Sequence, residues 1–309
     1  MSELIDLIHA TVRLEQARGG GVSTVGTGFV LSAPDADGRP QTILVTADHV
    51  FKRMPGDKVK VGFRVAGDDG AWRYAPVSVR IRGAEGEPLW TAHPMQDVAA
   101  IALPDGVPRA ALPVARLATS QTVSRLDLEP GDEMMVLGYP QGFASNAAGF
   151  PILRAGRVAS YPLSPPGRYP TFMLDVSVYG GNSGGPVYVV RSINGRPPEV
   201  ILTGVLTQEF RMNDNRLEIG NVTQAAYVAE TLSLMKGAAA AEVTPATGVL
   251  PQADPMPSAG GVEPTAGQRL REGWNDLMVD IGVLARRAWI VARETVLGWI
   301  TPAPRRAGA

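Results

Sequence analysis

The sequence predicts an all-β fold for the first three quarters of the chain. Short runs rich in Val, Ile and Thr recur between Gly, Pro and Asp turn signals as far as about residue 235. Two of these runs, residues 58–61 and 77–82, alternate apolar with polar or charged side chains, as half-exposed strands do. Roughly a dozen such strands with little helix between them are typical of β-barrels or of a β-sandwich.

The individual elements follow from these runs and from the turn residues that bound them. In chain order, the main predicted strands are residues 9–14, 42–46, 58–61, 77–82, 97–103, 133–137, 152–160, 172–176, 186–190 and 200–207. Residues 225–236 have helical spacing of Tyr227, Leu232 and Met235, and we expect this helix to close the domain. One folded domain is therefore predicted over residues 1–236.

Composition excludes several classes of protein and site. The chain has 309 residues and is 45% hydrophobic, which is enough for a substantial core. A net charge of −1 argues against a nucleic-acid binder, which needs clustered Lys and Arg. The absence of cysteine excludes disulfides, thiolate metal sites and a cysteine nucleophile. The N-terminus lacks a secretory signal pattern and no uncharged apolar run reaches about 18 residues, so a cytoplasmic location is predicted.

The composition changes after the predicted domain. Residues 237–268 are rich in Ala, Gly, Pro and Thr, which predicts a flexible linker. Residues 269–301 repeat apolar side chains every 3.6 residues, with acids early and arginines late, which predicts an amphipathic helix before a tail at 302–309. Three roles for this helix stay open: docking on its own domain, binding a partner protein or a second copy, and adsorbing to a membrane surface.

A serine flanked by glycines lies in residues 180–187 (GGNSGGPV). Glycine suits positions where the backbone needs a positive φ or where a ligand must approach closely. A nucleophilic serine needs a hydroxyl that stands clear and backbone N–H groups that point at the developing oxyanion. We therefore interpret Ser183 as a candidate nucleophile and the N–H groups of Gly181 and Ser183 as an oxyanion hole. The alternative is a plain glycine-rich turn.

A serine nucleophile also needs a base and an orienting carboxylate. Of the chain's three histidines, His49 is the one within a motif, at residues 46–50 (TADHV), where a strand end can face a cleft. Asp97 opens the apolar segment 96–103 (QDVAAIAL), so it can be buried at one end and aimed into the same cleft. Taken alone, each has a structural alternative: a hydrogen-bonded histidine, or a cap at the start of a strand.

The order His…Asp…Ser and these three segments together resemble the trypsin/chymotrypsin-like serine proteases, and among them the bacterial high-temperature-requirement (HtrA-like) type. The supporting segments are residues 26–31 (GTGFVL), 136–142 (VLGYPQG), 156–160 (GRVAS) and 203–207 (TGVLT). The resemblance covers about residues 8–235. It implies two six-stranded antiparallel β-barrels with the active site between them, and it implies no metal and no organic cofactor.

The resemblance also implies a role for each site residue. Ser183 is the expected nucleophile, His49 the general base and Asp97 the residue that orients the base, with the oxyanion hole at Gly181 and Ser183. The substrate-binding residues that it implies are Ser177, Tyr179, Gly180, Thr207, Gln208 and Glu209, and Thr207 is expected to face Asp97. Ser177 stands where basic-specific relatives carry an aspartate, so we expect a preference for a small or medium apolar residue.

Two departures from the family limit what carries over. Asn182 replaces the aspartate that digestive relatives use to bind a newly cut N-terminus, so activation by cleavage of a pro-segment is not implied. Residues 237–309 are too short and too rich in proline for the PDZ domain that usually follows HtrA-type proteases.

The sequence thus predicts a serine endopeptidase that acts on protein or peptide substrates through an acyl-enzyme, without a nucleic-acid partner. The alternative is a latent or non-catalytic trypsin-like scaffold, in which helix 269–301 docks a partner or a membrane. The intact set of three site residues argues against the scaffold.

Overall fold

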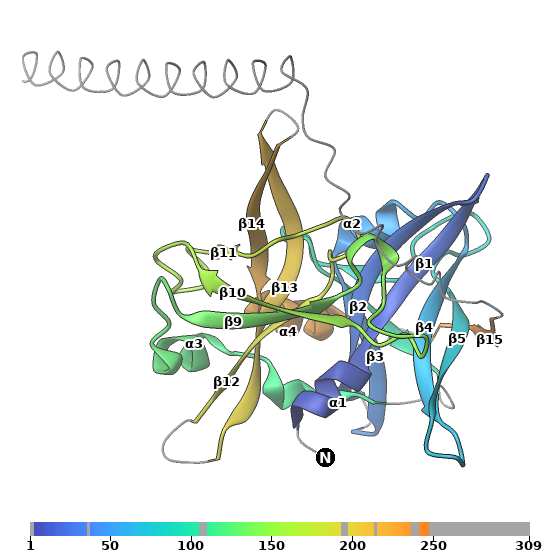
Figure 1. The fold of residues 1–309 in the computed structure, drawn as a ribbon, viewed down its shortest axis with the longest axis horizontal. Helices are drawn as coiled ribbons and strands as arrows, with labels where there is room; N and C mark the ends of the chain where they lie inside the picture. The colour runs from blue at the N-terminus through green and yellow to red at the C-terminus, as the bar shows by residue number, and fades with distance from the viewer. Residues whose placement is uncertain are drawn as a thin grey trace, which may run out of the picture. The chain divides into compact units, whose positions relative to one another are not determined.

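The computed structural model describes residues 3–35, 38–104, 110–192, 197–212, 215–235 and 241–246. The chain divides into two units, residues 1–253 and 254–309, and the described residues all lie in the first. The predicted helix 269–301 and tail 302–309 lie outside the described residues, as does most of the predicted linker. Figure 1 shows the first unit as two β-structures side by side, one from each half of the domain.

The second half of the domain forms a closed six-stranded barrel. Its strands are antiparallel and follow one another around the barrel in the order β10-β11-β14-β13-β12-β9. Their bounds are β9 (Glu133–Gly138), β10 (Ile152–Val158), β11 (Thr171–Asp175), β12 (Pro186–Arg191), β13 (Glu199–Met212) and β14 (Asn215–Gln224). This is the six-stranded antiparallel barrel that the family resemblance implies.

The first half forms a nine-stranded sheet in the order β15-β5-β4-β1-β2-β3-β7-β6, with β8 pairing parallel to β2. The bounds are β1 (Thr11–Gly19), β2 (Val22–Pro34), β3 (Pro40–Thr46), β4 (Lys58–Ala66), β5 (Trp72–Arg80), β6 (Thr91–Ala92), β7 (Ala99–Leu103), β8 (Leu112–Pro113) and β15 (Val243–Pro245). The expected all-β class is confirmed. The resemblance implies a closed barrel here, but within the described residues the sheet of the first half is open. Its edge strands are β15, which pairs with β5, and the two-residue β6, and they do not pair with each other.

Strand β15 comes from a stretch where the sequence predicts linker. Ala241 is buried in the core of the open sheet and its N–H donates to the carbonyl of Ala102 at 2.9 Å. Glu242 pairs with Arg80 on β5, with 2.7 Å between Oε2 and Nε. The chain therefore stays attached to the domain as far as residue 246.

In the described residues, helices are few and mostly short. They are α1 (Glu3–Ala10), α2 (Asp48–Lys52), α3 (Ser120–Leu126) and α4 (Ala225–Leu234), with 3-10 turns η1 (Val114–Arg116) and η2 (Pro140–Gly142). The predicted closing helix is confirmed as α4, and the strand predicted over 9–14 begins only at Thr11, after α1. No helix in the described part of the chain combines the length and the apolar character needed to cross a membrane.

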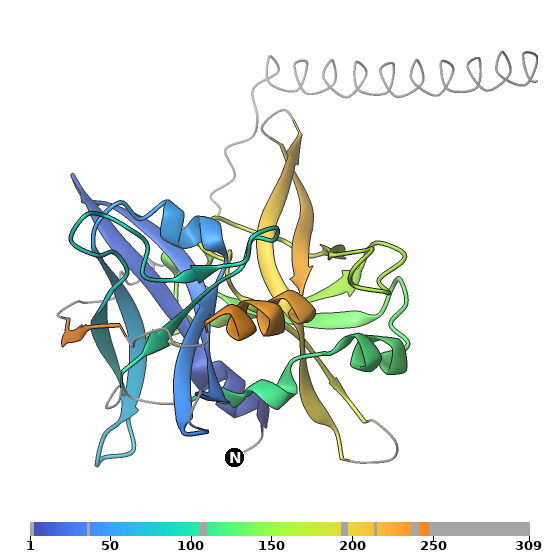
Figure 2. The ribbon, with the colours of Figure 1, turned by 180° about the vertical axis from the view of Figure 1, so that it is seen from behind.

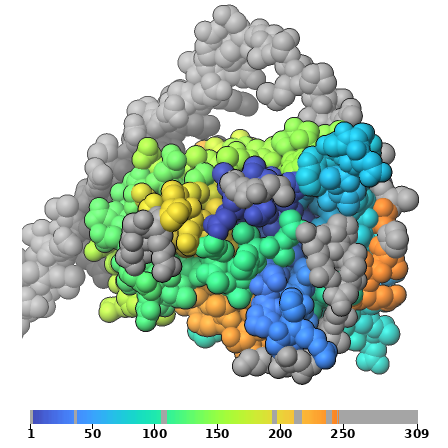
Figure 3. Space-filling view, turned by 90° about the horizontal axis from the view of Figure 1, so that it is seen from below, coloured from blue at the N-terminus to red at the C-terminus, as the bar shows by residue number. Residues whose placement is uncertain are grey.

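Two helices connect the two β-structures. Seen from behind, α4 lies across their junction, where it contacts β13 and β14 of the closed barrel and β6 and β7 of the open sheet (Figure 2). From below, the start of the chain lies between the surfaces of the two halves (Figure 3). There Leu7 of α1 is fully buried, and α1 contacts both β2 and β13. The junction is therefore packed at its back and base.

Candidate active site

His49 lies on α2, the helical turn that follows β3. The sequence predicts His49 at the end of a strand, whereas in the structure β3 ends at Thr46 and His49 is the second residue of α2. Asp48 is buried, and its carboxylate accepts hydrogen bonds from Trp90 Nε1 at 2.8 Å and from Lys52 Nζ at 2.5 Å. The Asp48 carboxylate is thus bound to Trp90 and Lys52, and the His49 ring is bound to a different carboxylate.

That carboxylate is Asp97. The Nδ1 atom of His49 lies 2.6 Å from Asp97 Oδ2, and the backbone N–H of His49 donates to Oδ1 at 2.9 Å. An ionised carboxylate only accepts hydrogen bonds, so Nδ1 carries the hydrogen and Nε2 is left as the proton acceptor. Burial alone would raise the pKa of Asp97, but the hydrogen bonds and charge of His49 outweigh it and lower that pKa below its ordinary value.

Ser183 sits in a turn that only glycine can build at two positions. Gly181 has a φ of +96° and Gly184 a φ of +88°, both in the region that L side chains rarely adopt. A Cβ on Gly181 would stand 2.4 Å from the carbonyl oxygen of Tyr139, and one on Gly184 would stand 2.0 Å from that of Thr27. Glycine is therefore required at positions 181 and 184 by the close approach of other backbone segments.

Hydrogen bonds orient the peptide planes of this turn. The carbonyl of Gly180 accepts from the N–H of Gln141 at 2.6 Å. In a trans peptide the C=O and the following N–H point in opposite directions, so the Gly181 N–H points away from Gln141. Within the described residues, the N–H groups of Gly181 and Ser183 have no acceptor in the chain. Two free donors thus stand beside the Ser183 hydroxyl.

Thr27 of β2 joins this turn to the open sheet. It is fully buried, its hydroxyl donates to the carbonyl of Gly181 at 2.7 Å, and it accepts from the N–H of Tyr139 at 3.1 Å. Its backbone N–H donates to the carbonyl of Ser183 at 2.9 Å. The sequence singled out residues 26–31 as a matching segment but assigned Thr27 no role, because its partners lie more than 100 residues away.

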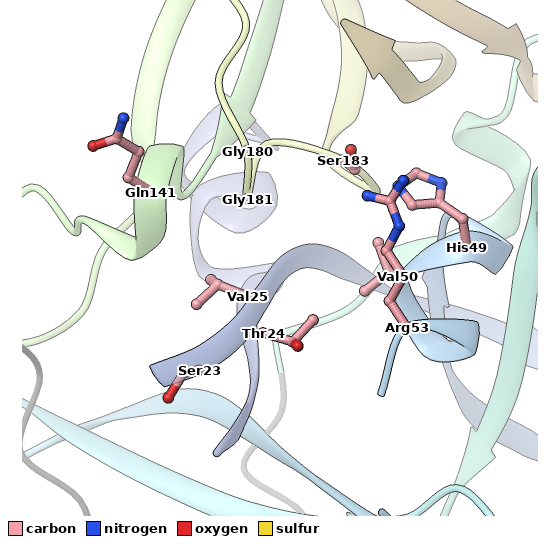
Figure 4. A pocket seen from close by; sticks show the side chains of 10 residues that line it. All are labelled: Ser23, Thr24, Val25, His49, Val50, Arg53, Gln141, Gly180, Gly181 and Ser183. Atoms are coloured by element: carbon pink, nitrogen blue, oxygen red, sulfur yellow. The ribbon is translucent and has the colours of Figure 1, made fainter. Parts of the chain in front are cut away.

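The Ser183 hydroxyl donates to the carbonyl of Thr207 at 3.3 Å. Among the described residues no hydrogen bond joins it to His49, although both side chains line one pocket of about 320 Å³ (Figure 4). The residues that line this pocket are Ser23, Thr24, Val25, His49, Val50, Arg53, Gln141, Gly180, Gly181 and Ser183. The structure thus places Ser183 and His49, the hydrogen-bond partner of Asp97, at a common cavity.

The six residues predicted to bind substrate come from two segments, one before and one after Ser183 in the sequence. Ser177 and Tyr179 come from the segment after β11, and the ring of Tyr179 carries the guanidinium of Arg154 at 5.1 Å from its centre. Thr207 is buried, and its hydroxyl donates to the carbonyl of Asn221 at 3.2 Å rather than to Asp97. Of the six residues, Gly180 is the one that lines the pocket; Gln208 and Glu209 follow Thr207 on β13.

A family model described as a trypsin-like peptidase domain matches residues 26–192. No curated protein sequence is significantly similar to the chain.

Solved structures with a related chain trace include HtrA-type proteases. A variant of the HtrA-type protease AlgW with a tripeptide is 18% identical, with a TM-score of 0.47 over 76% of this chain and 62% of that one. The Rv3671c protease from M. tuberculosis in its active form is 24% identical, with a TM-score of 0.44 over 76% of this chain and 84% of that one. The chain therefore spans less than two thirds of the length of the first of these structures.

Proposed function

Because the chain belongs to the family of trypsin-like peptidases, we propose that it is a serine endopeptidase that cleaves protein peptide bonds through Ser183, His49 and Asp97. The observation that carries the proposal is the Asp97–His49 pair, 2.6 Å apart, at the pocket that also holds Ser183. A base already held by a carboxylate is what a serine hydroxyl needs to become a nucleophile at neutral pH.

The proposed reaction has two steps with Ser183 as the group that is acylated. In the first, Oγ attacks the substrate carbonyl while His49 Nε2 takes its proton and passes it to the leaving amine, which breaks the C–N bond. In the second, a water attacks the ester carbonyl while His49 Nε2 takes its proton. The C–Oγ bond then breaks, the acid product leaves, and His49 returns the proton to Oγ. Asp97 keeps the Nδ1–H tautomer and stabilises the imidazolium throughout.

The free N–H groups of Gly181 and Ser183 would bind the oxyanion of each tetrahedral intermediate. Because these N–H groups already point at the position of the oxyanion before the reaction starts, they stabilise the developing negative charge without reorganisation. To reach His49, the Ser183 hydroxyl has to leave the carbonyl of Thr207 by rotating about its Cα–Cβ bond.

Labelling with a fluorophosphonate probe tests the proposal directly, because this probe reacts with an activated serine without needing a known substrate. We expect the wild-type chain to be labelled, and labelling to disappear in Ser183→Ala and in His49→Ala. Peptidase activity of Ser183→Ala should fall by on the order of 10⁶-fold. Ser124→Ala, on α3, is the control, because it removes an exposed serine hydroxyl that does not line the pocket.

Wild-type protein that folds but is not labelled would favour a latent or non-catalytic scaffold. The hydrogen bond from Ser183 to Thr207 instead of His49 is the observation that keeps this alternative open. Labelling that persists in Ser183→Ala would contradict the assignment of the nucleophile.

A further inference from the structure

Arg53 stands in the pocket beside Ser183, and the proposed mechanism gives it no task. It follows α2 directly, and its backbone N–H donates to the carbonyl of His49 at 3.0 Å. Residues four apart on a helical turn share one face, so Arg53 lies on the same side of α2 as His49. Figure 4 shows its side chain pointing from the turn toward the end of the pocket that holds His49 and Ser183.

The charge of Arg53 is not neutralised by the protein. Of the described residues that line the pocket, it is the single one of the types Lys, Arg, Asp and Glu. Its guanidinium forms no ion pair with any carboxylate in the part of the chain that the structure describes. The neighbouring Lys52 differs, because its ammonium is paired with Asp48. The pocket therefore offers an unpaired cation next to the nucleophile.

A second arginine braces this arrangement. The guanidinium of Arg18 on β1 donates to the backbone carbonyl of Arg53 and, at 2.5 Å, to the hydroxyl of Thr24. Arg18 thus ties the end of α2 to the pocket wall formed by β2, and it brings a second positive charge next to two lining residues, Thr24 and Arg53. A concave site lined by charge of one sign attracts ligands of the opposite sign.

The chemistry of the proposed reaction assigns this pocket to one half of the substrate. His49 must deliver its proton to the departing amine, so the leaving half has to lie on the side of Ser183 where α2 stands. The pocket is built from α2, from β2 at Ser23–Val25, from the turn at Gln141 and from Gly180, Gly181 and Ser183 of the nucleophile turn, and it contains no residue of β13. Thr207 on β13, whose carbonyl accepts from the Ser183 hydroxyl, does not line this pocket, which leaves β13 for the acyl half.

We infer that Arg53 makes this pocket a carboxylate subsite, so that the chain prefers substrates with a carboxylate at the first or second residue after the cleaved bond. The inference rests on the proposed function for its assignment to the leaving half. The carboxylate can come from an Asp or Glu side chain or from the end of a substrate cut two residues from its C-terminus. Because Arg53 is exposed, the preference is modest, about two- to fivefold at low salt.

Binding to the inert Ser183→Ala chain tests the subsite without requiring turnover. Immobilised Ser183→Ala protein is incubated with peptide mixtures randomised on the acyl side and carrying Asp, Asn or Lys at the first or second position after the central bond. Retained peptides are quantified by mass spectrometry. We expect Asp to be enriched over Asn about two- to fivefold, and the enrichment to fall as salt rises. Asn is the matched comparison because it has the shape of Asp without its charge.

Variants in the same background assign the effect to one side chain. Arg53→Gln should bring the Asp-to-Asn ratio close to one, and Arg53→Glu should favour Lys. Arg73→Gln is the control, because it removes an equally exposed arginine on the β4–β5 hairpin, where it pairs with Asp69. Mixtures that end two residues after the central bond as a free acid or as an amide separate a chain-end carboxylate from a side-chain carboxylate.

Equal retention of Asp and Asn, a ratio that survives Arg53→Gln, or no retained peptide would overturn the subsite. Fluorophosphonate labelling of the wild-type chain is read separately. Labelling without a preference for Asp overturns the subsite alone, whereas a preference for Asp without labelling keeps the carboxylate site and favours the latent or non-catalytic scaffold over the active peptidase.

Discussion

Asp97 accepts two hydrogen bonds from a single residue: Oδ2 from the ring of His49 at 2.6 Å and Oδ1 from its backbone N–H at 2.9 Å. The same carboxylate therefore holds both the imidazole and the start of α2, which comes from a segment 48 residues earlier. Rotation of the ring would break one bond while the other still holds the residue in place. This double contact makes the orientation of His49 a property of the fold before any substrate binds.

Asp97→Asn should lower peptide turnover by about 10⁴-fold while the protein remains folded. An amide can present an N–H to Nδ1, which would favour the tautomer with its hydrogen on Nε2 and leave no acceptor for the Ser183 proton. Steady-state kinetics on a cleaved peptide measures the loss, and circular dichroism confirms folding. A well-folded variant with at least a tenth of wild-type turnover would contradict the orienting role.

Acid stability should also depend on this pair. The folded state holds the pKa of Asp97 below its ordinary value, so its contribution is present above the unfolded carboxyl pKa of about 4 and is lost as pH falls through the lower folded value. Urea midpoints of wild type and Asp97→Asn should therefore converge between pH 6 and pH 3. A difference between the two proteins that grows toward low pH would contradict the sign.

Gly181→Ala should disrupt the oxyanion turn. A Cβ there meets the Tyr139 carbonyl oxygen at 2.4 Å and imposes a side chain on a φ of +96°, so the N–H donor has to move. We expect labelling and turnover to fall about 10²- to 10³-fold, as for the loss of one oxyanion donor. Gly180→Ala is the matched control for folding, because nothing lies within 4 Å of its added Cβ. Equal melting temperatures of the two variants would contradict the steric argument.

Thr27→Val should reduce activity although Thr27 lies outside the pocket lining. The change keeps the shape of the side chain but leaves the Gly181 carbonyl and the Tyr139 N–H without their partner, at a cost of about 1–3 kcal/mol for each buried group. Thr27→Ser retains the hydroxyl and should restore most of the labelling rate. A loss in kcat with little change in KM would show that Thr27 positions the Ser183 turn and does not act through substrate binding. Equal activity of the Val and Ser variants would contradict this positioning role.

Removal of β15 should destabilise the domain. A chain that ends at residue 240 loses buried Ala241 and the pairing of β15 with β5, whereas one that ends at residue 246 keeps both. We expect the shorter chain to be less stable by about 1–3 kcal/mol in urea denaturation. Glu242→Gln, which breaks only the exposed ion pair with Arg80, should change stability little. Equal midpoints for the two truncated chains would show that residues 241–246 add nothing.

The sequence alone determined the β class, the closing helix and the three segments that carry His49, Asp97 and Ser183. Alternation of apolar and polar side chains and clustered glycines are local signals, and each of these predictions rests on a run of neighbouring residues. The sequence predicts a strand end at the short helix that carries His49, because five residues are too few to show the 3.6-residue helical repeat of apolar side chains.

Which residues these segments contact was decided by the tertiary structure. Thr27 gains its role from Gly181 and Tyr139, and Arg53 gains its role from the pocket that β2 closes around it. Likewise, β15 forms because residues 243–245 pair with the edge strand β5, although the proline-rich sequence around them predicts a linker. Such contacts join residues from about 30 to more than 160 positions apart, and no local pattern of side chains encodes a partner at that distance.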